Sequence, residues 1–263
     1  MDPAQLVDRN FGPHPLRVCA EDVSDFVKAT GDDAERWMTG APPGFMAVAL
    51  FVVASELLGR LADRSVIHGE QTFAWHRPLV MESQLQVQGT VRRVRERGGT
   101  AFVDFEVTAS DERGTVAEGT SLFLVSGPVA PLPDSEQRVE ASPEDDGKPG
   151  PGRISASRAD LVRYAAATRD WNPIHWDHDA AVAAGLPGVV AHGLLQAAWI
   201  FVAASSLRPG DAPLATARVR FRNPLLPATP VSVRVEETGD VAVVAVADDD
   251  VEYVSARIEL TER

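Results

Sequence analysis

Two stretches of this 263-residue chain have the length of a helix and are apolar on nearly every face. They run from Gly44 to Leu58 (GFMAVALFVVASELL) and from Gly193 to Ser206 (GLLQAAWIFVAASS). A helix on a protein surface keeps one polar face, so a helix without such a face must be enclosed by other elements. The fold therefore has to wrap two separate helices, and the residues that follow each helix must supply the wrapping.

Segments with the pattern of β-strands follow each apolar helix. In residues 101–107 (AFVDFEV), apolar side chains alternate with Asp104 and Glu106, as in a half-buried strand. The expected strands are residues 66–76, 84–94, 100–109 and 115–125 in the first half, and 214–222, 231–237, 241–247 and 251–260 in the second. Short amphipathic helices are expected before the apolar ones, at residues 21–30 and 157–168. We predict an α+β fold in which each half is a central buried helix wrapped by an antiparallel meander.

A polar segment separates the two halves. Residues 128–152 contain six prolines and six acidic residues with little aliphatic periodicity, which is typical of an extended linker. We predict a first domain at residues 1–127, a linker at 128–152 and a second domain at 153–263. WHRPL at residues 75–79 aligns with FRNPL at residues 221–225, so the halves also form a weak internal repeat.

The second half has a longer loop before its apolar helix, and this loop contains the sequence DWNPIH from Asp170 to His175. Pro173 disfavours helical geometry at Asn172, so the preceding helix should end and leave Asp170 and His175 in the loop. A carboxylate near an imidazole can orient it and share proton transfers with a water molecule. Taken alone, the same spacing also fits a polar turn in which His175 packs on Trp176.

Gly193 begins the second apolar helix directly after His192. The backbone N–H groups of Gly193 and Leu194 have no acceptor within the first helical turn, and they lie at the positive end of the helix dipole. Such donors suit a developing oxyanion, and a glycine permits close approach of a ligand carbonyl. The alternative is that Gly193 only starts the helix and His192 caps it.

Several motifs resemble one known family. YAAATRDWNPIHWDHDAA at residues 164–181 resembles the signature of MaoC-like and (R)-specific enoyl-CoA hydratases, which ends G-D-x-N-P-hydrophobic-H-x5-A. HGLL at 192–195 resembles the start of that family's central helix. APPGF at 41–45, IHGEQ at 67–71 and HRPL at 76–79 resemble the N-terminal MaoC-type dehydratase domain of two-domain dehydratases. The resemblance covers nearly the whole chain outside the linker.

The resemblance implies a double hot-dog fold with its chemistry in the second domain. Asp170 and His175 would hold and activate water and return a proton at the α carbon, while the Gly193 N–H would polarise the thioester carbonyl. The first domain would be non-catalytic and would supply a wall of the acyl pocket. The expected substrate-binding residues are Asn172, His192, Leu194, Phe45 and Phe51.

The chain departs from the family pattern at Arg169, where the family usually has glycine. A bulky cation there would narrow the site, pair with Asp170 and lower its pKa, or point outward. The first half has an echo of the motif at Asp32, but no N-P-x-H follows, so we interpret Asp32 as a helix-end residue. We interpret His68 and Glu70 as a structural hydrogen-bonding pair.

Charge and composition restrict the function classes. A net charge of -13 argues against binding to nucleic acid or to an anionic membrane. The one cysteine, Cys19, fits a reducing compartment, and the N-terminus lacks the basic and apolar regions of a secretory signal. The longest uninterrupted apolar run, residues 45–54, is too short to cross a bilayer. We therefore expect a cytoplasmic protein.

We expect no metal and no other cofactor. His175-x-x-His178, with Asp177 and His192, matches no standard zinc spacing, and the hydration chemistry needs no metal when an oxyanion hole is present. The chain has no glycine-rich phosphate loop of the Walker or dinucleotide type. A basic hairpin would either meet the phosphates of coenzyme A or form a solvated face; its residues are Arg92, Arg93, Arg95 and Arg97.

These observations predict a lyase that reversibly hydrates a 2-enoyl thioester, with coenzyme A as the favoured carrier, to an (R)-3-hydroxyacyl thioester. The alternatives are a 3-hydroxyacyl-carrier-protein dehydratase of fatty-acid or polyketide synthesis, and a non-catalytic subunit that binds acyl thioesters. Two hot-dog units would make a pseudo-dimer within one chain, and the exposed sheet edges are also compatible with a homodimer.

Overall fold

The computed structural model describes residues 1–128 and 151–262. In the first half the main elements are β1 (Asn10–Arg17), α1 (Ala20–Thr30), α2 (Met46–Arg60), β3 (Arg64–Trp75), β5 (Gln84–Arg97), β6 (Thr100–Asp111) and β7 (Gly114–Pro128), with the short pair β2 (Gly40–Ala41) and β4 (Leu79–Val80). In the second half they are α3 (Arg158–Thr168), α4 (His178–Ala183), α5 (Gly193–Ser205), β8 (Leu214–Phe221), β9 (Ser232–Thr238), β10 (Val241–Ala247) and β11 (Glu252–Leu260). The predicted α+β class is confirmed. The predicted linker lies outside the described residues except at its ends, so the domain boundaries stay a prediction.

The strands form one antiparallel sheet in the order β1-β5-β6-β7-β3-β8-β11-β10-β9. In each half, the first strand after the central helix pairs with the last strand of that half: β3 with β7, and β8 with β11. The simple meander expected from the sequence is therefore wrong for these first strands. The segments around Pro78 and Pro224 are too long for tight hairpins, and they carry the chain across to a new position in the sheet.

The two halves share this sheet because β3 pairs with β8, in register from Glu70 opposite Arg220 to Ala74 opposite Thr216. On the outer face, the Glu70 carboxylate pairs with Arg218 at 2.8 Å and with Arg220 at 3.2 Å. The first half thus lies directly beside the second-half strand that leads to Phe221.

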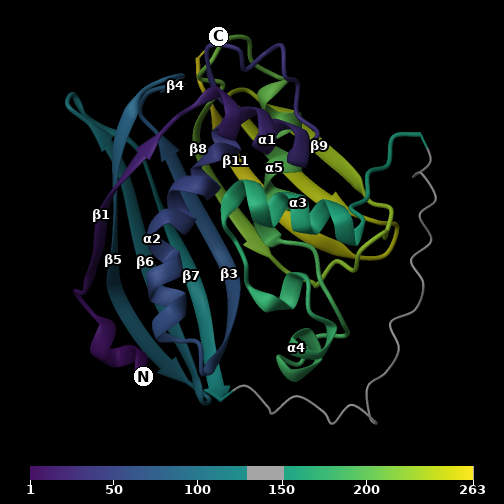
Figure 1. Cartoon of the computed structure of the whole chain (residues 1–263). Coiled ribbons are helices and arrows are strands. Elements are labelled where there is room, and N and C mark those ends of the chain that lie inside the picture. Colours follow the sequence, from purple (N-terminus) through teal and green to yellow (C-terminus); the bar gives the residue numbers. More distant parts are fainter. Residues whose placement is uncertain (129–150, 263) are drawn as a thin grey trace.

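Both apolar helices pack against the sheet (Figure 1): α5 is buried along nearly its whole length, whereas Ser55, Glu56 and Gly59 of α2 are exposed. Helix α2 packs on β1, β5 and β6, and α5 packs on the strands of the second half, while α1 packs against α3. Large buried side chains fill the space between helix and sheet; they include Phe11, Leu50, Leu57 and Phe105 from the first half, and Leu195, Ile200, Val219 and Val244 from the second. The sheet covers the helices because most of the surface of each helix is apolar and cannot be left in water.

One stretch, residues 43–60, is long and apolar enough to cross a membrane when only length and composition are considered. The sequence estimate missed it because it counted only uninterrupted apolar residues. In the structure this stretch is α2 with its preceding turn, and 67% of it is buried inside the protein. It is the core helix of the first half, which passes the same test as a membrane span.

The N-terminal strand β1 was not predicted. It contains Pro13 and Pro15, and proline lowers the expectation of a strand because it cannot donate a ladder hydrogen bond. In the structure β1 lies at the edge of the sheet, where a missing donor can face outward, and among the described strands it pairs only with β5.

Candidate active site

The loop between α3 and α5 is shaped by the C-terminal end of α3 and by a single helical turn that follows it. Helix α3 starts with a capping box between Ser157 and Asp160, and it ends at Arg169, whose φ of 66° is left-handed. The chain then reverses, and the Asn172 side chain accepts from the Ile174 N–H to start the single turn Pro173–His175. The helix end and this turn bring Asp170 and His175 together.

Asp170 and His175 are each only 7% exposed. The distance from His175 Nε2 to Asp170 Oδ2 is 4.0 Å, and His175 Nδ1 lies 2.8 Å from the Val190 carbonyl oxygen. Because a carbonyl can only accept, Nδ1 must carry the proton, and in the neutral ring Nε2 keeps its lone pair facing Asp170. A gap of 4.0 Å is too long for a direct hydrogen bond, but a water molecule can bridge it.

Burial moves the pKa values of the two groups in opposite directions. It raises the pKa of Asp170 to about 7, although the Asn172 N–H donates to the carboxylate and opposes the change. It lowers the pKa of His175 to about 4, and the hydrogen bond to Val190 opposes that change. Near neutral pH His175 is therefore uncharged, and the Asp170 carboxyl group retains its proton to a far higher pH than an exposed aspartate does.

His192 lies behind His175 and does not line the cavity. The two rings stack with centroids 3.8 Å apart, and His192 Nε2 lies 3.2 Å from the backbone oxygen of Asp170, to which it must donate. Burial lowers the pKa of His192 well below its usual value, and nearby His175 adds to this effect. The structure thus places His192 behind the pair, in contact with both Asp170 and His175, and not at the cavity wall where the sequence expected it.

The N-terminus of α5 faces the same cavity. Gly193 is its first residue, no side chain caps the helix, and the Gln196 N–H is bonded to the His192 carbonyl. The N–H groups of Gly193 and Leu194 precede the first intrahelical donor, and both residues line the cavity. A side chain at position 193 has no room, because an added Cβ would lie 2.7 Å from Phe221 Cδ1.

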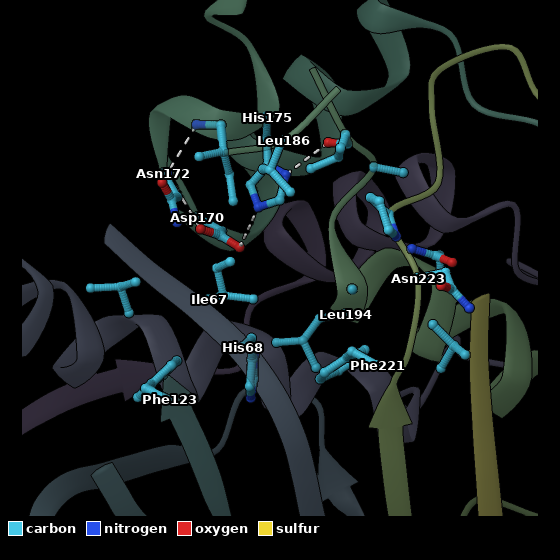
Figure 2. Close-up of a pocket in the computed structure, with 18 of the residues that line it drawn as sticks. Ile67, His68, Phe123, Asp170, Asn172, His175, Leu186, Leu194, Phe221 and Asn223 are labelled. Atoms are coloured by element: carbon cyan, nitrogen blue, oxygen red, sulfur yellow. Dashed lines mark hydrogen bonds and ion pairs between the residues drawn. The ribbon is translucent and has the colours of Figure 1, made fainter. Parts of the chain in front are cut away.

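The cavity has a volume of about 270 Å³ and is lined by both halves of the chain. Figure 2 shows Asp170, Asn172 and His175 on one side of it and Asn223 on the other, with Leu194 between them. The first half contributes Phe51 from α2, Ile67 and His68 from β3, and Phe123 from β7. Of the residues expected at the site, the structure therefore brings Asp170, Asn172, His175, Gly193, Leu194 and Phe51 to one cavity.

Phe45 is not at this cavity. It is 1% exposed and packs edge-on against Phe26, with ring centroids 5.7 Å apart. The sequence could not separate Phe45 from Phe51, because both lie in an apolar helix with no polar face to set its orientation. Phe51 lies six residues further along the chain, and it lines the cavity.

His68 is at the cavity, where the sequence did not expect it. Its ring lies between Phe123 and Phe221, at centroid distances of 4.9 and 4.8 Å, and burial lowers its pKa to about 4. His68 contacts the backbone of Glu70 and not its carboxylate, because a β-bulge at Gly69 shifts the register between them. The bulge sends His68 inward and Glu70 outward to its arginine partners.

Arg169 does not neutralise Asp170. Its side chain is exposed, and the pKa of Asp170 is raised and not lowered. Arginines of the basic hairpin in the first half form ion pairs with acidic side chains: Arg92 pairs with Glu106 at 2.6 Å, and Arg93 pairs with Asp104 at 2.8 Å. This pairing on the strand face agrees with the solvated-face interpretation.

Within the described residues, Asp170, His175 and His192 form the one group whose ligand atoms could hold a metal ion, all within 4.8 Å of one another. The geometry does not fit such a use. The two imidazole planes are 24° from parallel, so their in-plane lone pairs run side by side and do not converge at the roughly 2.0 Å that zinc requires. Asp177 and His178 are not part of this group.

Comparison with known proteins identifies two family models along the chain. The model described as "MaoC like domain" matches residues 138–257, and the model described as "FAS1-like, dehydratase domain region" matches residues 5–118. A curated relative, 3-hydroxyacyl-thioester dehydratase X of Mycobacterium tuberculosis, is 28% identical over 175 residues, which are 64% of this chain and 59% of that protein. The match with this relative thus spans less than two thirds of its length.

Solved structures share the fold. The crystal structure of HtdX of Mycobacterium tuberculosis superposes with a TM-score of 0.77 at 21% identity, covering 96% of this chain and 100% of that one. A second Mycobacterium tuberculosis protein, described as having a double hotdog fold, superposes with a TM-score of 0.64 at 12% identity, covering 97% and 96%. The predicted double hot-dog fold is confirmed.

Proposed function

Because this chain belongs to the MaoC-like dehydratase family, we propose that it hydrates a 2-enoyl thioester reversibly to an (R)-3-hydroxyacyl thioester, with coenzyme A as the carrier. The observation that carries the proposal is the buried pair of Asp170 and His175 beside the uncapped N-terminus of α5, in one cavity. An acid, a base and an oxyanion site are the three parts that this reaction needs.

The thioester carbonyl is proposed to accept hydrogen bonds from the N–H groups of Gly193 and Leu194. The helix dipole and the low polarity of the cavity stabilise the negative charge that develops on this oxygen. The α and β carbons then lie beside Asp170 and His175, because these side chains line the same cavity.

Proton transfer follows from the protonation states. A water that bridges the pair loses a proton to Nε2 of His175 as its oxygen bonds to the β carbon. The carboxyl proton of Asp170 goes to the α carbon, and the proton on His175 then returns to Asp170, which restores the starting pair. The water thus supplies one OH and, through the pair, one hydrogen, and the reverse sequence dehydrates the product.

The proposal is tested with 2-butenoyl thioesters of coenzyme A and of acyl carrier protein, by following loss of the enoyl absorbance. Asp170→Asn and His175→Ala should each lower kcat by about a thousandfold while circular dichroism shows a folded protein. The matched control is Asp32→Asn, at the corresponding position after α1, which should keep the wild-type rate. Folded Asp170 and His175 variants with wild-type rates would refute the assignment.

The same measurement separates the other possibilities. Faster turnover of the carrier-protein thioester would indicate the synthetic dehydratase, and acyl thioester binding without any turnover would indicate a binding subunit. The acidic surface, with a net charge of -13, favours coenzyme A, because an acidic carrier protein would be repelled. A single cysteine suits a cytoplasmic location, and sedimentation of the purified protein would distinguish a monomer from a homodimer.

A further inference from the structure

A second cavity, of about 450 Å³, lies on the other side of Asp170. It shares Phe51, Leu58, Ile174 and Asp170, among other residues, with the first cavity, so the two spaces meet at Asp170. Its walls are the C-terminal half of α2, the start of β3 and the segment from Arg169 to Ala184. Most of its lining is apolar, which suits a hydrocarbon chain.

For the proposed reaction, the positions of Gly193 and Asp170 determine which part of a substrate enters this second cavity. Gly193 lines only the first cavity, whereas Asp170 lines both. A thioester with its carbonyl at Gly193 and its α carbon at Asp170 therefore directs the rest of its acyl chain into the second cavity. Its sulfur then faces the opposite side, where Figure 2 shows Asn223.

Two arginines line this second cavity, Arg64 at the start of β3 and Arg169 at the end of α3. In the part of the chain that the structure describes, neither guanidinium lies within 4.0 Å of a carboxylate oxygen. Other arginines near the two halves' junction are paired, such as Arg218 with Glu70 at 2.8 Å and Arg222 with Glu252 at 2.6 Å. Asp63, next to Arg64 in the sequence, feels the charge of Arg64 without an ion pair of this length. Both guanidinium groups are thus available to an anionic ligand.

The backbone at Arg169 gives an independent reason to ascribe a role to its side chain. Its φ is 66°, a left-handed conformation that is disfavoured for a residue with a Cβ. The corresponding residue after α1 is Gly31, with a φ of 69°, which adopts this conformation without strain. Strained residues that persist tend to cluster at functional sites.

We propose that the substrate's acyl chain ends in a carboxylate, which Arg64 and Arg169 bind at the rim of the second cavity. This inference rests on the proposed function, whose substrate class it narrows. The methylene groups of the chain lie between Phe51, Leu58 and Ile174, and the terminal carboxylate forms charge-assisted hydrogen bonds with the two guanidinium groups.

The test uses a series of 2-enoyl-CoAs of increasing chain length. Each is compared with a chain of the same length whose terminal methyl group is replaced by a carboxylate. For chains long enough to reach the rim, the wild-type protein should show a kcat/KM about tenfold higher for the carboxylate than for the methyl end. A preference for the methyl end at every length would overturn the inference.

Variants assign the preference to the two arginines. Arg64→Gln and Arg169→Gly should each bring the carboxylate-to-methyl ratio close to one, whereas Arg97→Gln, an exposed arginine of the first-half hairpin, should keep the wild-type ratio. A ratio unchanged in both rim variants would also overturn the inference.

Calorimetric binding of the matched saturated acyl-CoAs separates this inference from the proposed function. Tighter binding of the carboxylate-ended chain without turnover of any enoyl thioester would support the inference and refute the reaction. Turnover of methyl-ended chains with no carboxylate preference in either assay would refute the inference alone.

Discussion

His175 Nδ1 lies 2.8 Å from the carbonyl oxygen of Val190, so the hydrogen bond between these two residues fixes the tautomer of the imidazole. The neutral ring must present an unprotonated Nε2 to Asp170, 4.0 Å away. In the proposed reaction, His175 is therefore the proton acceptor of the pair, and Asp170, with its raised pKa, is the proton donor.

The pH dependence of hydration tests this division of roles. If Asp170 must be protonated, kcat/KM should fall as pH rises through about 7, and it should fall again below about 4, where His175 becomes charged. Because the groups interact, the two midpoints belong to the pair. A profile that instead rises through the upper midpoint would assign the base to Asp170.

Asp170→Asn should stabilise the protein at neutral pH. The folded-state pKa of Asp170 is raised from 3.8 to about 7, so within this window the folded state binds more protons than the unfolded state, and wild-type stability falls as pH rises. The asparagine variant has no carboxyl group to ionise at this position, so it does not lose stability in this way. Its free energy of unfolding should exceed that of wild type by about 4 kcal/mol above about pH 7, and the difference should shrink to near zero by about pH 4.

Urea unfolding of both proteins across this pH range measures the effect. His175 is present in both, so its own titration largely cancels in the difference. A difference between the two proteins that does not change with pH would mean that Asp170 is not destabilised by burial in the folded state.

His192→Phe tests whether His192 acts through its neighbours. The phenyl ring keeps the stack on His175 but loses the hydrogen bond to the Asp170 backbone, so kcat should fall about tenfold with little change in KM. The upper midpoint of the pH profile should also move, because the Asp170 loop is less constrained. An unchanged midpoint together with an unchanged kcat would leave His192 only a packing role.

The sequence predicted the parts of this site that depend on local chain geometry. Pro173 and Asn172 set the turn that presents His175, and Gly193 starts the buried helix, so these features followed from neighbouring residues. The position of His68 depends on a bulge against β7, which alternation along one strand does not reveal. The shared sheet depends on pairing between residues about 150 positions apart, such as Glu70 and Arg220, which no local pattern encodes.

Gly193→Ala should be costly for a steric reason. The added methyl group would lie 2.7 Å from Phe221, so the ring must move, and the free energy of unfolding should fall by about 1 to 3 kcal/mol. Turnover should also fall, because Phe221 lines the cavity. Adding Phe221→Leu should recover most of the lost stability in thermal unfolding. If the two substitutions instead change the stability additively, the clash does not involve Phe221.

An exchange between Arg169 and Gly31 separates backbone strain from side-chain contacts. The two residues end α3 and α1 with φ values of 66° and 69°. Since glycine adopts this conformation freely, Arg169→Gly should raise the free energy of unfolding by about 1 kcal/mol. Gly31→Arg should lower it by a similar amount, because an added Cβ there meets no atom within 4 Å and only the backbone penalty remains. Thermal unfolding of the two variants measures both changes. Destabilisation by Arg169→Gly would instead show that contacts of the Arg169 side chain outweigh its backbone strain.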